Sequence, residues 1–250
     1  MISPASVSKD ELVHGIFNKI APRYDFLNAV ASFGRHYNWQ KKLIEAVAPR
    51  RGSRVLDVCC GTGMITLDLA QRLGAAGRVV GVDFSESMLA VAAANLRKSG
   101  LRDRVGLVCA DAQKLPFADN TFDAVTIGYG LRNVGDMRQT LLEIKRVLKP
   151  GSRIGSLELA KPYVPGFKQL YNLYMAVGVP LLGKFIAHNK DAYRYLHDSI
   201  VAYPHQHEVT QIYRELGFEN PRCYELTLGI ASVHVAAKPI VISAEHPERS

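Results

Sequence analysis

One stretch, from Arg54 to Thr66, restricts the possible folds of this chain more than any other. It consists of a short apolar run around Asp57, two turn glycines at Gly61 and Gly63, and the start of an amphipathic segment. This pattern predicts a strand, a tight turn and a helix. Glycine lets the backbone pass close to a ligand, and the first turn of a helix directs unpaired N–H groups toward the same place. The stretch therefore predicts a ligand-binding turn.

Short apolar runs alternate with amphipathic segments from residue 53 onward. The runs predict strands over Arg54–Cys60, Arg78–Asp83, Val105–Ala110, Ala124–Gly128 and Arg153–Leu159. Apolar residues at helical spacing predict helices between them, over Met64–Leu73, Ser85–Ser99 and Val134–Leu148. Strands joined by helical crossovers form a mostly parallel sheet with both faces covered, a doubly wound α/β fold. Such sheets bind ligands beyond the carboxyl ends of their strands.

Helical segments are predicted on both sides of this alternation. Helical spacing predicts helices over Asp10–Ile20 and Arg35–Val47, separated by a polar and aromatic patch at Arg23–Asn28 that follows no repeat. After a helix at Glu208–Leu216, the strands Cys223–Leu228 and Ile230–Ala237 are expected to pair antiparallel around Gly229 at an edge of the sheet. We therefore expect a helical cap at residues 1–52, the α/β core at 53–159, an aromatic insert at 160–207, completion of the sheet at 208–240 and a flexible tail at 241–250.

Composition limits the class of protein. With 48% hydrophobic residues the chain can bury a core, and its net charge of +8 suits an anionic partner, either a membrane surface or nucleic acid, unless the charges are simply solvated. The four cysteines show no C-x-x-C spacing, so buried free thiols in a reducing cytoplasm are expected. No signal peptide and no membrane span is predicted.

The turn glycines are followed, at the end of the next predicted strand, by Asp83. Glycines for close approach and a carboxylate for two ribose hydroxyls are typical of a nucleoside site. A dinucleotide fingerprint needs glycine or alanine where this chain has Thr66, and a phosphate-binding loop needs a lysine that is absent between residues 55 and 72. With acids also at Asp57 and Asp111, the predicted ligand is an adenosyl group without phosphates, although each acid alone could be a cap or a surface charge.

Motifs along the chain resemble a known family. Val55-Leu56-Asp57 to Gly63, Val82-Asp83, Asp111-Ala112 and Phe122-Asp123 resemble class I S-adenosylmethionine-dependent methyltransferases, which have a Rossmann-like fold. Residues 21–25 (APRYD), 130–134 (GLRNV), 147–151 (VLKPG) and 191–196 (DAYRYL) resemble the ubiquinone/menaquinone biosynthesis C-methyltransferases in particular. The resemblance covers residues 11–238, nearly the whole chain.

The resemblance implies a seven-stranded sheet with a reversed last strand and methylation of a ring carbon on a prenylated benzoquinol or naphthoquinol. It places S-adenosylmethionine against Asp57, Thr66, Asp83, Asp111, Ala112 and Gly128, with Gly61 and Gly63 shaping the turn. Asp83 would hold the ribose, and Asp111 with Ala112 the adenine. The chain departs from many relatives at Cys59-Cys60 and at Tyr129, where phenylalanine is common, and we interpret both as packing changes.

A sulfonium methyl group is already activated, so no metal is expected, and no H-E-x-x-H or clustered ligand set occurs. Catalysis then consists of aligning a reduced ring with the methyl group and stabilising a developing phenolate. Arg132 and Asn133 are the candidates for this stabilisation, with Tyr24 completing the wall. A structural Arg132 paired with a nearby acid is the alternative, since arginine is a poor base.

Several histidines remain open as the general base: His14, His36, His188 and His197. The pair His205 and His207 is interpreted as a surface turn. The aromatic insert predicts an apolar chamber for the quinol and the start of its prenyl tail; an ordinary core or a dimer surface is the alternative. Its apolar side chains include Tyr163, Phe167, Tyr171, Tyr174, Met175, Val177, Phe185, Tyr193, Tyr195 and Tyr203.

The sequence thus predicts a cytoplasmic, membrane-peripheral C-methyltransferase acting on a demethylmenaquinol-type quinol, with a homodimer left open. A nucleic-acid base methyltransferase would carry an Asn/Asp-Pro-Pro-aromatic stretch where this chain has Gly128-Tyr129-Gly130, so no nucleic-acid partner is expected. A non-catalytic cofactor-binding component of a quinone-pathway assembly is the rival from another class. A nicotinamide dehydrogenase is disfavoured by Thr66.

Overall fold

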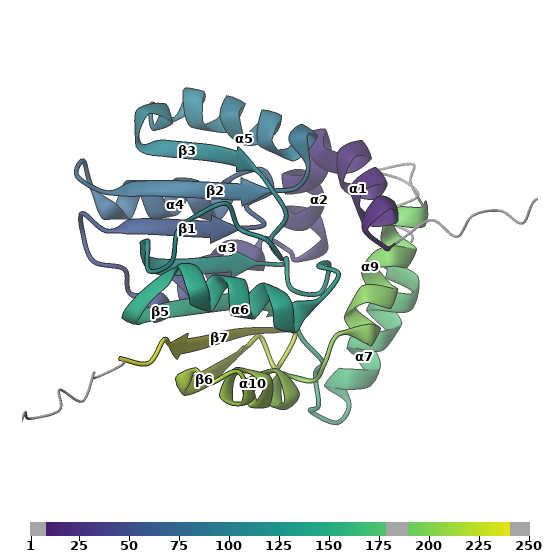
Figure 1. Ribbon diagram of the computed structural model, residues 1–250. Coiled ribbons are helices and arrows are strands. Elements are labelled where there is room, and N and C mark those ends of the chain that lie inside the picture. The colour runs from purple at the N-terminus through teal and green to yellow at the C-terminus, as the bar shows by residue number, and fades with distance from the viewer. Residues whose placement is uncertain (1–8, 179–189, 241–250) are drawn as a thin grey trace, which may run out of the picture.

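A seven-stranded sheet with helices on both faces forms the body of the molecule (Figure 1). The computed structural model describes residues 9–178 and 190–240. The strand order is β3-β2-β1-β4-β5-β7-β6. Neighbouring strands from β3 through β5 are parallel, and β7 runs antiparallel to both β5 and β6. The strands are β1 (Arg54–Val58), β2 (Arg78–Asp83), β3 (Val105–Cys109), β4 (Phe122–Gly128), β5 (Leu148–Leu159), β6 (Glu219–Leu226) and β7 (Ala231–Ala237). The predicted mostly parallel sheet with a reversed last strand is confirmed.

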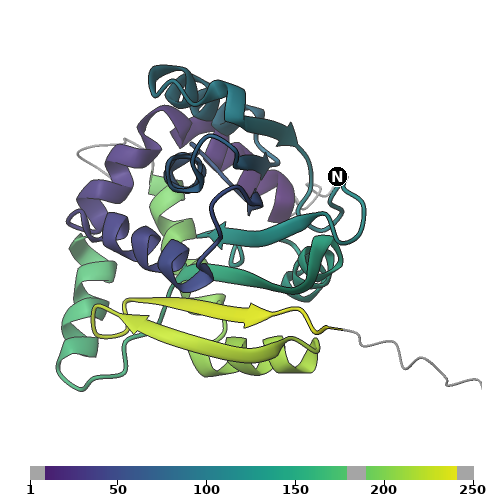
Figure 2. The same cartoon turned by 90° about the vertical axis from the view of Figure 1, so that its left-hand side faces the viewer.

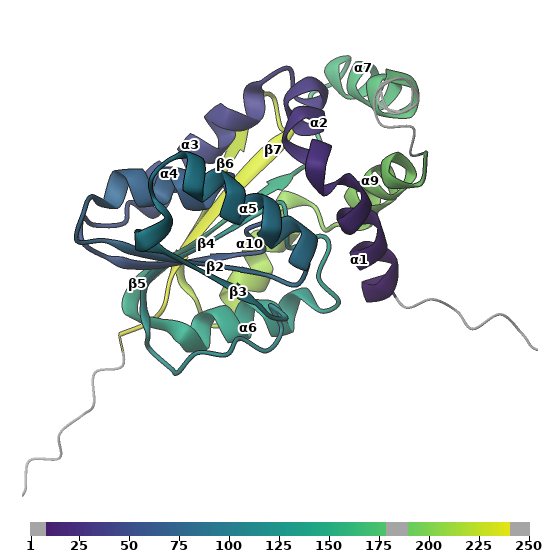
Figure 3. The ribbon, with the colours of Figure 1, turned by 90° about the horizontal axis from the view of Figure 1, so that it is seen from above.

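Two groups of helices cover the two faces of the sheet (Figure 3). One face packs against α3 (Arg35–Val47), α4 (Met64–Leu73) and α5 (Glu86–Lys98), and the other against α6 (Met137–Val147) and α10 (Gln206–Glu215). Side chains alternate along a strand, so Val55 of β1 packs with α3 and α4, whereas Leu56 packs with α6. Each fully buried aliphatic side chain contributes about 1.5–3 kcal/mol, so these layers stabilise the sheet that carries the turn after β1.

Several boundaries differ from the sequence prediction. The patch at residues 23–28 is helical: a short 3₁₀ turn at Ala21–Arg23 leads into α2 (Tyr24–Ala31). None of the α2 residues is buried, and with eight residues the helix is too short to show a clear helical repeat in the sequence. Helix α6 begins three residues later than predicted, because the Asp136 carboxylate accepts hydrogen bonds from the N–H groups of Arg138 and Gln139 and caps it.

The strands β5 and β6 also begin earlier than predicted, at Leu148 and Glu219 rather than Arg153 and Cys223. None of the β6 residues is buried, because this strand lies at the edge of the sheet beside β7 (Figure 2). A mostly exposed edge strand lacks the apolar run that predicts a strand from sequence.

The remaining helices lie beyond the carboxyl ends of β1 to β5 (Figures 1 and 3). They are α1 (Lys9–Ile20), α2, α7 (Phe167–Leu173), which continues as a π-helical turn at Tyr174–Gly178, and α9 (Lys190–Ala202). Ser85, before α5, donates a hydrogen bond to Asn18 of α1 at 2.6 Å. The Tyr174 hydroxyl donates to the Ala31 carbonyl at 2.8 Å. These bonds join the predicted cap and insert to each other and to the end of the sheet where a ligand is expected.

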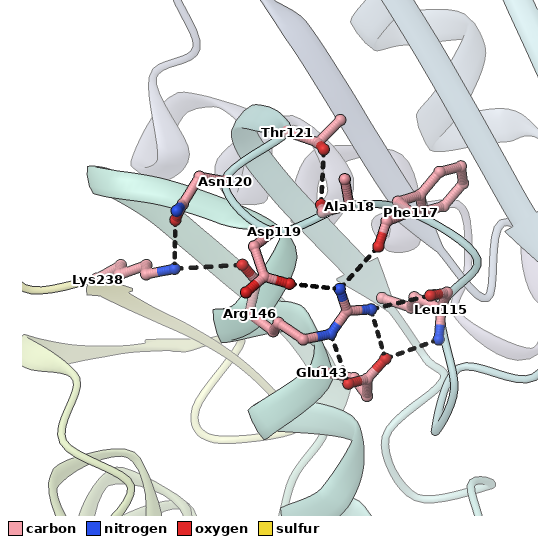
Figure 4. Close-up of polar contacts among 9 residues, drawn as sticks. All are labelled: Leu115, Phe117, Ala118, Asp119, Asn120, Thr121, Glu143, Arg146 and Lys238. Carbon is pink, nitrogen blue, oxygen red and sulfur yellow. Dashed lines mark hydrogen bonds and ion pairs between the residues drawn. The ribbon is translucent and has the colours of Figure 1, made fainter.

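The Arg146 side chain holds the long loop between β3 and β4 against α6 (Figure 4). It donates hydrogen bonds to the carbonyls of Leu115 and Phe117, at 2.9 and 2.7 Å, and forms ion pairs with Glu143 and Asp119. Glu143 in turn accepts a hydrogen bond from the Leu115 N–H at 2.9 Å. The loop that begins with the predicted adenine site at residues 111–112 is thereby fixed at its far end.

The four cysteines are free thiols, but they are not all buried. Cys60 is buried, Cys59 and Cys223 are partly buried, and Cys109 is exposed. The prediction of burial is wrong for Cys109 because β3 is an edge strand, so the end of the strand faces solvent. The predicted tail at residues 241–250 lies outside the described residues.

Candidate functional site

A cavity of about 230 Å³ lies at the carboxyl ends of β1, β2, β3 and β4. Its wall contains five of the predicted cofactor residues, Gly61, Asp83, Asp111, Ala112 and Gly128. Backbone hydrogen bonds continue just beyond the strands and align the carboxyl ends of β1, β2 and β3. The Cys60 N–H donates to the Val82 carbonyl, and the Ala110 N–H donates to the Asp83 carbonyl. The parallel register therefore gathers residues that are far apart in the chain into one wall.

The turn after β1 adopts the left-handed backbone that its glycines permit. Gly61 has φ +53° and Gly63 has φ +83°. A Cβ at Gly63 would lie 3.1 Å from the Ala92 Cβ, so this glycine allows α5 to pack close to the turn. A Cβ at Gly61 would meet no atom, because Gly61 borders the open cavity. Gly61 thus leaves room for a ligand, and Gly63 shapes the turn.

Asp83 is held rigidly at the end of β2. One carboxylate oxygen accepts a hydrogen bond from the Gly61 N–H at 2.8 Å, and the other accepts from the Ser85 N–H at 2.9 Å. The side chain is only 6% exposed yet lines the cavity. Because each carboxylate oxygen can accept more than one hydrogen bond, this arrangement suits a pair of vicinal hydroxyls.

Asp57 and Thr66 do not line this cavity, in contrast to the prediction that both contact the cofactor. The Thr66 hydroxyl donates to Asp57 at 2.6 Å, and the Thr126 hydroxyl donates to the other oxygen of Asp57 at 2.7 Å. All three side chains are buried, and burial raises the pKa of Asp57 to about 6. Threonine replaces the third fingerprint glycine because its hydroxyl joins α4 to β1, a contact between segments that no local pattern reveals.

The β3 end of the cavity has exposed Asp111 beside buried Ala112. Asp111 accepts a hydrogen bond from the Gln113 N–H at 2.8 Å, and the Gln113 side chain accepts one from the Asp136 N–H. Sequence reasoning missed several other wall residues. They include Val13 and Phe17 of α1, and Phe84 and Met88 after β2. For Phe84 and Met88, the signal available in the sequence was an apolar residue directly after Asp83.

A second cavity, of about 350 Å³, is lined mostly by aromatic and apolar side chains. The predicted insert residues Phe167, Tyr171, Tyr174 and Met175 contribute one side of its wall. The other side comes from the cap, of which the sequence singled out only Tyr24 and His36. The remaining cap residues in this wall are Asn28, Ala31, Ser32, Phe33, Arg35 and Trp39. Tyr24 and Tyr129 line both cavities. We call the first cavity the polar cavity because Asp83, Asp111 and Gln113 lie in its wall, and the second the aromatic cavity. The two cavities adjoin at these tyrosines.

The other predicted insert residues in the described part of the chain lie elsewhere. Tyr163 lines a separate surface groove, Tyr195 lines a small pocket beside α1 and α2, and Tyr203 is in the main core. Phe185 lies outside the described residues, as does the Tyr193 side chain. The alternative of an ordinary core thus holds for Tyr203.

The three predicted catalytic residues come together at the junction of the cavities. Tyr24 lines both cavities, Asn133 lines the polar one and Arg132 the aromatic one. Asn133 donates to the Tyr129 carbonyl at 2.9 Å and accepts from the Tyr195 hydroxyl at 3.0 Å. The Asn133 amide is therefore held from two sides.

Arg132 forms a buried ion pair with Glu158, a residue that the sequence did not single out. The two side chains are 6% and 2% exposed. The contact of Arg132 Nη1 with Glu158 therefore agrees with the alternative left open by the sequence, a structural arginine paired with a nearby acid. Burial acts to lower the pKa of Arg132, but Glu158 and Tyr24 outweigh it and raise this pKa, so the guanidinium stays charged. Its Nε has no hydrogen-bond partner among the residues that the structure describes.

Of the four histidines left open as the base, His36 lines the aromatic cavity. Its Nδ1 is 2.9 Å from the Ser32 hydroxyl, and burial lowers its pKa, so it is neutral near pH 7. His197 is exposed beside Asp198. The His14 side chain and His188 lie outside the described part of the chain. His205 caps α10, and its ring stacks on that of His207.

Comparisons with known proteins agree with this geometry. The ubiE/COQ5 methyltransferase family matches residues 5–238. A demethylmenaquinone methyltransferase from Desulfitobacterium hafniense is 44% identical over 231 residues, covering 92% of this chain and 91% of the relative. One from Staphylococcus saprophyticus is 43% identical, covering 92% and 98%. The fold is similar to a Haemonchus contortus phosphoethanolamine N-methyltransferase in complex with S-adenosylhomocysteine, with a TM-score of 0.65, 18% identity, and coverage of 95% of this chain and 62% of that one.

Proposed function

Because the chain belongs to the ubiE/COQ5 methyltransferase family, we propose that it methylates a ring carbon of a prenylated naphthoquinol of the demethylmenaquinol type. The methyl donor is S-adenosylmethionine. The observation that carries the proposal is the pair of adjoining cavities, one with a carboxylate suited to a nucleoside and one lined by aromatic side chains, which meet at Tyr24 and Tyr129.

The polar cavity fits the cofactor. S-adenosylmethionine supplies a methyl group already activated by its sulfonium charge. Asp83 would hold the ribose hydroxyls, because its carboxylate is fixed by two backbone N–H groups. Asp111 and Ala112 would contact the adenine at the end of β3, and the space beside Gly61 would admit the ligand.

The aromatic cavity would hold the quinol ring. Ring carbons are nucleophilic when the ring is reduced and a hydroxyl loses its proton, so the site must stabilise negative charge on that oxygen. Arg132 is a buried cation in this wall, and a cation away from water stabilises such charge strongly. His36 is neutral in the same wall and would accept the hydroxyl proton. As the ring carbon bonds to the methyl group, the bond from that methyl to the sulfonium sulfur would break and S-adenosylhomocysteine would leave. The ring-carbon proton would then pass to water, and the ring oxygen would take back the proton held by His36, which restores the aromatic quinol.

We also propose that the enzyme works at the cytoplasmic surface of a membrane, because a prenylated quinol resides there. The structure contains no helix able to cross a membrane among residues 9–178 and 190–240. Exposed apolar side chains, Phe33 at 78% and Leu170 at 63%, line the mouth of the aromatic cavity, and Leu173 and Val177 are exposed on the same segment as Leu170. With Arg35 beside Phe33, this apolar rim would bind an anionic bilayer.

The decisive experiment incubates the purified protein with S-adenosylmethionine labelled in its methyl group and with a prenylated demethylnaphthoquinol. We expect label in the reduced quinol and much less in the oxidised quinone. Equal transfer to both forms would contradict activation through the phenolate. Cofactor binding without any turnover would favour a non-catalytic role, and label in nucleic acid instead would show a different substrate class.

A further inference from the structure

Tyr129 occupies the turn where the two cavities adjoin. Its backbone has φ +58°, a left-handed conformation that is uncommon for residues other than glycine. The Tyr129 N–H donates to the Leu157 carbonyl at 2.7 Å. The Tyr129 carbonyl accepts from Arg132 Nη1 at 3.0 Å and from Asn133 Nδ2 at 2.9 Å. Strained backbone held by surrounding bonds is typical of functional sites, and here these bonds fix the direction of the tyrosine side chain.

The Tyr129 hydroxyl is buried and has no hydrogen-bond partner among the described residues. Burial raises the pKa of Tyr129 well above its ordinary value, so the hydroxyl keeps its proton and remains a donor. A buried donor without a partner is costly, and packing alone would be served by a phenylalanine. Tyr203 has a similar unpaired hydroxyl in the main core, whereas Tyr129 lines both cavities, so a bound ligand can supply the partner that the Tyr129 hydroxyl lacks.

A second donor without a partner belongs to the same wall. Arg132 Nε is buried and unpaired within the described part of the chain, and the Arg132 Cζ is 5.8 Å from the centre of the Tyr129 ring. Both residues line the aromatic cavity. Two unpaired donors side by side favour a ligand that brings an acceptor oxygen, such as a phenolic or carbonyl oxygen on a ring.

We propose that the Tyr129 hydroxyl donates a hydrogen bond to a ring oxygen of the substrate, beside Arg132 Nε, and so sets how the ring lies against the methyl donor. This inference rests on the proposed function for the identity of the ring. Under this proposal Tyr129 is a substrate-binding residue, in place of the packing change expected from the sequence.

The test compares Tyr129→Phe with Tyr203→Phe. Tyr203 also has a buried hydroxyl without a partner among the described residues, but it lies in the main core and lines neither cavity. Trp39 is the single tryptophan of the chain and lines the aromatic cavity, so quenching of its fluorescence reports binding of a reduced naphthoquinol with a short prenyl tail. Cofactor affinity and Tm are measured on the same samples.

We expect Tyr129→Phe to bind the naphthoquinol about fivefold to tenfold more weakly than the wild type, the factor that one ordinary hydrogen bond contributes. Tyr203→Phe should bind it as the wild type does. Cofactor affinity should be unchanged in both variants. Both should raise the Tm by about 2 °C, since each removes an unpaired buried hydroxyl.

Equal naphthoquinol affinity in the two variants would overturn the proposal. A lower Tm for Tyr129→Phe would also overturn it, because the hydroxyl would then have a partner before any ligand binds. If the naphthoquinol does not quench the Trp39 fluorescence of the wild type, the aromatic cavity does not bind it and the proposal is overturned. If the wild type binds the naphthoquinol but transfers no methyl group, the proposed function fails while the titration still decides the role of Tyr129.

Discussion

At the scale of single residues, Arg132 combines a structural contact with a proposed chemical role, and the two can be separated. Arg132→Met or Glu158→Gln alone leaves one buried charge unpaired, so each should lower the free energy of unfolding by about 3–5 kcal/mol. The double variant removes both charges and should recover most of this loss. If Arg132 stabilises the developing phenolate, the double variant should still turn over at least ~100-fold more slowly, with cofactor affinity unchanged.

The measurement is urea unfolding together with single-turnover methyl transfer. A double variant that regains both stability and turnover would show that Arg132 serves only the fold. Loss of cofactor affinity would instead indicate that the pair positions the turn after β4.

Asp57 makes a prediction about pH. Its pKa is raised to about 6 in the folded protein, compared with about 3.9 in an unfolded chain. Between these values the folded state holds a proton that the unfolded state has lost, so this group's contribution to stability is present below about pH 4 and is lost as pH rises through 6. The change amounts to about 3 kcal/mol.

Asp57→Asn abolishes this titration, although one threonine hydroxyl must then find a new acceptor. The difference in free energy of unfolding, Asp57→Asn minus wild type, should therefore rise from about pH 4 to about pH 6.5. Urea titrations at four pH values measure this difference. A difference that stays constant with pH would mean that the Asp57 carboxyl titrates normally.

At the scale of elements, the loop between β3 and β4 depends on α6 through Arg146. Arg146→Ala removes the bonds to two loop carbonyls and to Glu143, so it should cost about 2 kcal/mol of unfolding free energy. Cofactor affinity should fall severalfold because the loop begins at Asp111 and Ala112. The matched control is Arg138→Ala on the same helix, whose ion pair with Glu215 is exposed and should contribute under about 1 kcal/mol. Equal effects of the two substitutions would contradict the anchoring role.

At the scale of the whole molecule, the apolar rim around the aromatic cavity predicts an orientation on membranes. Phe33→Ser with Leu170→Ser should reduce cosedimentation with phosphatidylglycerol vesicles by about tenfold or more, because two exposed apolar anchors are lost. Leu142→Ser on α6 also removes an exposed apolar side chain, but away from the cavity, and should bind vesicles as the wild type does. The alternative is that the apolar rim serves as a dimer surface. Sedimentation velocity without vesicles would then find the wild type and Leu142→Ser dimeric and the Phe33→Ser, Leu170→Ser variant monomeric.

The fold and the polar cavity were largely predictable because their signals are local. Alternating apolar runs predict the sheet, and the carboxyl ends of parallel strands always meet at one edge, so Gly61, Asp83 and Asp111 had to lie near one another. The aromatic cavity was only half predicted. Its insert side follows from composition, but its cap side depends on the packing of α2 and α3 against distant segments, as when Trp39 donates a hydrogen bond to Thr227.

The sequence by itself determined the alternation of strands and helices in the α/β core, the glycine turn after β1 and the acids at the strand ends, since backbone geometry and periodicity act over a few residues. Tertiary structure alone decided which polar groups pair and which do not. It turned Asp57 and Thr66 toward each other rather than toward the cavity, paired Arg132 with Glu158, and left the Tyr129 hydroxyl buried without a partner among residues 9–178 and 190–240. Those outcomes depend on contacts between segments far apart in the chain, which no local pattern encodes.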